Sequence, residues 1–76
     1  MSIMEFVTNE IKNLIKVMLN NKPYFESWVL SLYSVAELTR LVCQTKFYLS
    51  ITMENSEEAD NLELLNLKLQ NAIRNA

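Results

Sequence analysis

The 76-residue sequence contains no glycine, no histidine, one proline and a single cysteine, Cys43. One thiol cannot form an intrachain disulfide, and without histidine a structural zinc site has too few soft ligands. The sequence also has no imidazole base and no glycine-rich phosphate loop, and its one thiol lies in an apolar stretch. It therefore predicts a protein that is not an enzyme and that holds no cofactor and no metal.

Charge of neither sign dominates the chain, which carries 7 Lys and Arg against 9 Asp and Glu, a net charge of -2. Half of the residues are hydrophobic and 21% are charged, too apolar for a disordered chain and too charged for a membrane protein. The opening residues lack the basic region of a secretory signal, so we expect a cytoplasmic protein. In that setting we expect Cys43 to be a small core residue.

The first of three amphipathic segments is predicted to be a helix from about residue 2 to residue 20. Its apolar residues recur at spacings of three and four, which places them on one stripe: Met4, Val7, Ile11, Leu14 and Met18. Ser2 and Glu5 have the spacing of a capping box at its start. Two asparagines and Pro23 end it.

The second segment is predicted to be one long helix from 23 to about 53, because no further glycine or proline interrupts it. A bend, if present, is expected near Gln44 to Lys46. On a helical wheel, one broad arc is predicted to face the core: Tyr24, Phe25, Trp28, Leu32, Val35, Ala36, Val42 and Cys43. A charged stripe lies opposite this arc: Glu26, Glu37, Arg40 and Gln44.

The third segment is predicted to be a helix from about 56 to 75, with Asn55 or Ser56 as its N-cap. Its core stripe is Leu62, Leu65, Leu69 and Ala72. The carboxylates Glu57, Glu58, Asp60 and Glu63 suit the positive end of a helix dipole better than an acid-base or metal role. The fold class is thus predicted to be all-α, a single domain over residues 1–76 with three helices.

Beside the charged stripe of the second helix lie apolar residues that two short helices could not easily cover. We interpret four of them as a surface for a second chain: Leu30, Tyr33, Leu41 and Tyr48. A single core of this size is marginal without a disulfide or a metal, so association is the remaining support. The predicted assembly is a helical-bundle homodimer paired through the second helix.

On these grounds we expect the protein to be a dimeric regulator, adaptor or inhibitor that binds a larger protein. One alternative is a nucleic-acid-binding regulator that uses the third helix or a small basic patch at Lys12 and Lys16. Another is a subunit of a hetero-oligomer. A membrane role is not expected, because Glu26, Glu37, Arg40 and Lys46 interrupt every apolar run that could span a bilayer.

Overall fold

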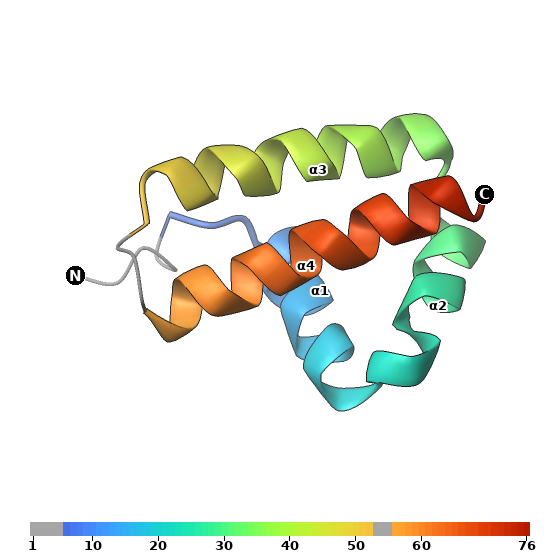
Figure 1. Cartoon of the computed structure of the whole chain (residues 1–76), viewed down its shortest axis with the longest axis horizontal. Helices are drawn as coiled ribbons and strands as arrows, with labels where there is room; N and C mark the ends of the chain where they lie inside the picture. The colour runs from blue at the N-terminus through green and yellow to red at the C-terminus, as the bar shows by residue number, and fades with distance from the viewer. Residues whose placement is uncertain (1–5, 53–55) are drawn as a thin grey trace.

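A computed structural model describes residues 6–52 and 56–76 of the chain. Within these residues the secondary structure is helical, which confirms the all-α class. The elements are α1 (Asn9–Asn20), the 3-10 turn η2 (Lys22–Tyr24), α2 (Phe25–Leu32), α3 (Val35–Ser50) and α4 (Glu57–Arg74). Figure 1 shows α3 and α4 running side by side along the 35 Å axis of the molecule.

The predicted long second helix is wrong, because the chain leaves helical geometry at Tyr33 and Ser34 and forms two helices, α2 and α3. Ser34 is extended, with φ -73° and ψ 163°, and its Oγ accepts a hydrogen bond from the Glu37 amide at 3.2 Å. The Glu37 carboxylate accepts in return from the Ser34 amide at 2.9 Å. This capping box satisfies donors that a helix start leaves free, so the chain can restart a helix here without glycine or proline. The sequence also allowed a bend or break near Gln44 to Lys46, and α3 runs through these residues without a break.

The other helix boundaries agree with the sequence in part. α1 begins at Asn9, later than expected, because the Thr8 hydroxyl caps it by accepting from the Ile11 amide at 3.3 Å. The predicted Ser2 and Glu5 capping box lies outside the described residues. α4 begins at Glu57 with Ser56 as its N-cap, one of the two residues predicted for that position; the other, Asn55, also lies outside the described residues.

α4 is the common partner in the packing, because α1, α2 and α3 all contact it. The predicted stripe of α4 is fully buried, and all described members of the α1 stripe are buried as well. Met4, the remaining member, lies outside the described residues. α2 contributes Phe25 and Val29 to the same core, and α3 contributes Leu38, Leu41, Val42 and Tyr48. The short helices are therefore held by shared burial of apolar side chains, which contributes more to their stability than their own helix propensity.

Polar contacts join the helices at three further places. In the core, Asn66 of α4 hydrogen-bonds Thr45 of α3, and both side chains are buried. At the surface, Lys68 of α4 lies 3.7 Å from the carboxylate of Glu26 in α2. The Tyr33 hydroxyl donates to the Glu10 carboxylate at 3.2 Å, which ties the junction between α2 and α3 to α1.

Candidate interaction surface

The four residues predicted to form an interface do not lie on one exposed surface. Leu41 is 0% exposed and Tyr48 is 7% exposed, so both belong to the core and the expectation that they are surface residues is wrong. Leu30 and Tyr33 are half-buried and pack against that core. Leu41 and Tyr48 are buried because of the break at Tyr33 and Ser34. A new helix start changes the direction in which every later side chain points.

The predicted core arc of the second segment fails as well, and for Val35, Ala36 and Cys43 the cause is the same break. Phe25 and Val42 are buried and Trp28 is half-buried, but the other members of that arc are exposed: Tyr24, Leu32, Val35, Ala36 and Cys43. The expectation that Cys43 is a core residue is therefore wrong. Within α3, the buried positions are instead Leu38, Leu41, Val42, Thr45 and Tyr48.

Tyr33 has a structural contact of its own at the junction. Burial raises the pKa of its phenol, and the neighbouring Glu10 carboxylate raises that pKa further, both through its charge and by accepting the hydrogen bond. The phenol thus stays protonated and acts as a donor between α2 and α1. A side chain engaged in this way is less available to a second protein than the sequence suggested.

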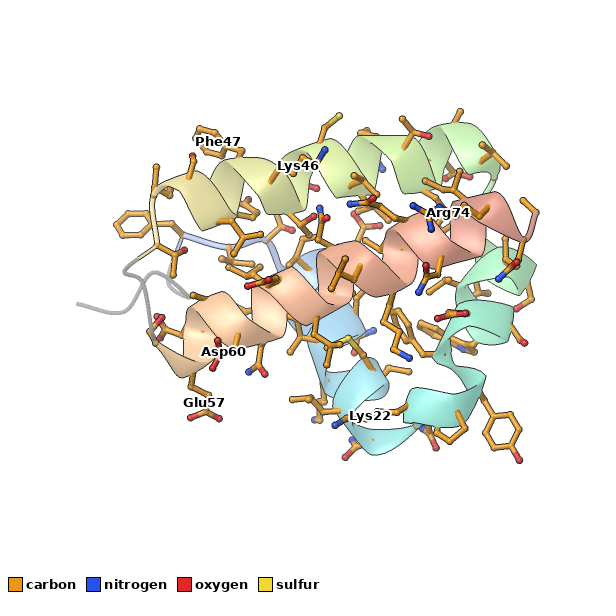
Figure 2. The ribbon with its side chains drawn as sticks, viewed as in Figure 1. Lys22, Lys46, Phe47, Glu57, Asp60 and Arg74 are labelled. Carbon is orange, nitrogen blue, oxygen red and sulfur yellow. The ribbon has the colours of Figure 1, made fainter. Side chains whose placement is uncertain are left out.

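Because α3 starts anew after Ser34, a different set of residues is exposed. We call this set the α3 outer face: Ala36, Arg40, Cys43, Phe47 and Ile51. These positions follow one another at spacings of three and four residues, so they form a single row along the helix. Phe47 is 60% exposed near the end of α3, and Ile51, the C-cap residue four positions later, is 51% exposed. In Figure 2 Phe47 projects from the side of α3 that faces away from α4. The row therefore ends in two large apolar groups that the described part of the chain leaves uncovered.

The charges of α3 accompany this row. Arg40 and Lys46 are both exposed, and neither makes an ion pair with the described residues. Glu37 is the only acid in α3. The hydrogen bonds from Ser34 lower the pKa of its carboxyl, and the charge of Arg40 lowers it to a smaller extent. The acid is thus engaged at the start of α3, and two cations flank the apolar residues of the outer face.

Other charged positions are spread over the molecule. Lys12 of α1 is half-buried and Lys16 is exposed on the same helix. On α4, Glu57, Asp60 and Glu63 are exposed in the first turns, and Glu57 points away from the bundle in Figure 2. No cluster of three or more metal-binding side chains occurs among residues 6–52 and 56–76. None of the helices described has the length and apolar character needed to cross a membrane.

Comparison with known proteins adds no relative: no family model matches the chain, and neither a curated protein nor a solved structure shows significant similarity to it. A functional interpretation must therefore be argued from the surface itself.

Sequence reasoning missed Phe47 and Ile51 as a pair, although a signal for them was present. The segment Ser34-Val35-Ala36-Glu37 has the S-x-x-E spacing of a capping box. A helix that starts at Ser34 need not keep the buried side of the preceding helix, so Leu38, Leu41 and Thr45 can define a buried side of their own, with Phe47 on the opposite side and Ile51 following it at the C-cap. The Ser34–Glu37 capping box was therefore the signal in the sequence for this helix start, and it contains neither glycine nor proline.

Proposed function

We propose that this protein is a non-catalytic protein-interaction module and that the α3 outer face is its binding surface. The observation that carries the proposal is the exposure of Phe47 near the end of α3 together with Ile51, the C-cap residue of that helix. Large apolar side chains that neighbour each other in water mark contact surfaces more often than isolated ones do. Aromatic groups of this kind commonly supply the central anchor of a protein interface.

The shape of this surface favours one mode of binding. α3 has 16 residues, about 24 Å of helix, and Phe47 projects from its side away from α4. An exposed helix face with neighbouring apolar residues can lie in a groove of another protein or against another helix. Arg40 would lie within such a contact and Lys46 beside it, where charge contributes to orientation and association rate. A small chain that binds in this way fits the role of a regulator, adaptor or inhibitor.

The test compares two surface variants of equal charge. In one, Phe47→Arg and Ile51→Arg place two cations on the α3 outer face. In the matched control, Leu32→Arg and Leu67→Arg replace apolar residues of similar exposure, 57% and 51%, at the end of α2 and on α4. Circular dichroism and urea unfolding establish that both variants are folded.

Binding is then measured with a purified protein that co-purifies with the tagged wild-type chain, by titration calorimetry. We expect the outer-face variant to lose binding and the control variant to retain it. Equal binding by both variants would remove the α3 outer face as the functional surface.

A further inference from the structure

The α3 outer face is self-complementary when two copies of it are placed antiparallel. Arg40 and Phe47 are equally far from a point between Cys43 and Gln44, and so are Ala36 and Ile51. Ala36, Arg40 and Phe47 lie on the same side of α3, because their positions on the helix are close to whole turns apart, and Ile51, the C-cap residue, continues this spacing. A two-fold axis through that point therefore brings Arg40 of one copy opposite Phe47 of the other, twice.

The groups that meet in this arrangement suit one another. A guanidinium over an aromatic ring is attracted by the negative face of the ring. Arg40 is exposed and has no ion pair with the described residues, so it is available for that contact. Ala36 is small and leaves room for the larger Ile51 of the second copy. Cys43, beside the axis, is small enough for the helices to approach to the usual interaxial distance of about 8–10 Å.

We propose that a second copy of this chain covers the α3 outer face, with the two α3 helices antiparallel and Arg40 of each copy against Phe47 of the other. This inference rests on the proposed function, since it names an occupant of the same surface. Isologous contact between identical faces is the commonest symmetry of protein dimers.

Area and charge set the expected strength of this dimer. Two helices that touch along about 24 Å bury less surface than the roughly 1,200 Å² of a stable interface. We therefore expect a weak dimer that dissociates on dilution. Both copies bring cations to the contact, Arg40 and Lys46, and the row itself has no carboxylate. Salt screens the repulsion between these cations, so added salt is expected to preserve or strengthen the dimer.

The first experiment measures mass in solution by sedimentation equilibrium over a wide range of concentration. We expect the wild-type chain to pass from monomer to dimer as its concentration rises. Phe47→Arg places a cation opposite Arg40 of the other copy and should raise the dissociation constant about tenfold or more. Adding Arg40→Glu to that variant places opposite charges at the same contact, so dimerisation should return. Circular dichroism checks that each variant keeps its helix content.

The second experiment uses Cys43, the only cysteine of the chain, as a reporter of the two-fold axis. Its exposed thiol adds to a maleimide, and a short bismaleimide should link two copies through Cys43 at concentrations where the dimer forms. The Phe47→Arg chain at the same concentration should give only singly modified monomer.

The inference would be overturned by a wild-type chain that stays monomeric to millimolar concentration, by a dimer that Phe47→Arg leaves intact, or by a failure of Arg40→Glu to restore the dimer. A dimer that salt weakens would also overturn it, because opposite charges would then hold the copies together. If the chain is monomeric while capture of another protein still depends on Phe47 and Ile51, the inference fails and the proposed function stands.

Discussion

The side-chain amide of Asn66 in α4 donates to the hydroxyl of Thr45 in α3 at 2.8 Å, and also to the Val42 carbonyl oxygen at 3.1 Å. The Thr45 hydroxyl in turn donates to the same carbonyl at 2.9 Å, and Gln70 donates to the Asn66 side-chain oxygen. No buried polar side-chain atom in the described residues is left without a partner. These hydrogen bonds can form at only one position of α3 along α4. Apolar contacts alone would allow neighbouring positions more easily.

Removing the Asn66 amide should destabilise the chain. Asn66→Ala deletes the hydrogen bonds to Thr45 and Val42 and leaves a void in the core, at a cost of about 2–3 kcal/mol in the free energy of unfolding. Asn66→Leu fills the volume with apolar atoms and should cost less, because the Thr45 hydroxyl keeps its bond to Val42. Urea unfolding followed by circular dichroism measures both. An alanine variant as stable as the wild type would show that the amide contributes nothing to stability.

The start of α3 depends on the Ser34 hydroxyl. Ser34→Ala removes the acceptor for the Glu37 amide and should lower the free energy of unfolding by about 1 kcal/mol, the usual value for an N-cap. Glu37→Gln is the matched change at the other end of the box, and it should cost less at neutral pH because glutamine can also accept from the Ser34 amide. Midpoints of urea unfolding compare the two, and a larger loss for Glu37→Gln would contradict the assignment.

Acid should weaken the same helix start. The hydrogen bonds from Ser34 hold the pKa of the Glu37 carboxyl below its value of 4.5 in an unfolded chain. The folded state therefore releases this proton more readily than the unfolded state. Its contribution to stability is present above about pH 4.5 and is lost as the pH falls through the lowered pKa. Thermal unfolding of the wild type and of Glu37→Gln, followed from neutral pH to about pH 3, should show the smaller decrease in the variant; parallel decreases would exclude this contribution.

Alkaline pH should act on the junction between α2 and α3. Burial, with the Glu10 carboxylate as the second cause, raises the pKa of the Tyr33 phenol above 10.0. The folded state holds this proton more tightly than the unfolded state, so the contribution is complete below about pH 10 and is lost as the pH rises through the raised pKa. Glu10→Gln should bring the tyrosinate titration of Tyr33 to lower pH. The absorbance difference between each protein and its Tyr33→Phe counterpart isolates this titration, and an unchanged midpoint would remove Glu10 as a cause.

Apolar periodicity was sufficient to predict the two outer helices of the sequence. Ile11, Leu14 and Met18 of α1 are buried as their spacing indicates, and so are all four residues of the α4 stripe. Each of these helices has one apolar side and lies against a single core, so the period of 3.6 residues is enough to identify the buried positions. Ser56 was one of two residues predicted as the N-cap of the last helix. It is the N-cap of α4, where its hydroxyl accepts a hydrogen bond from the Ala59 amide.

The middle of the chain was not predictable from periodicity alone. Residues between Tyr24 and Ile51 are apolar on several sides, so a continuous helix and two shorter helices both agree with the composition. The choice depends on the local bonds between Ser34 and Glu37. An error there transfers to every later residue, which is why Leu41 and Tyr48 were expected at the surface while Phe47 received no role. Prediction of the candidate surface therefore required the helix boundary first.

The position of α4 also determines how the molecule opens. α1, α2 and α3 each bury apolar side chains against this one helix, and Leu62, Leu65 and Leu69 are inaccessible to solvent. A fluctuation that detaches α4 removes the packing of the other three helices in the same event, whereas fraying at the end of α3 removes little. We therefore expect amide hydrogens in the middle of α1 and of α4 to exchange through the same global transition. On this view the described helical elements, although short, unfold together.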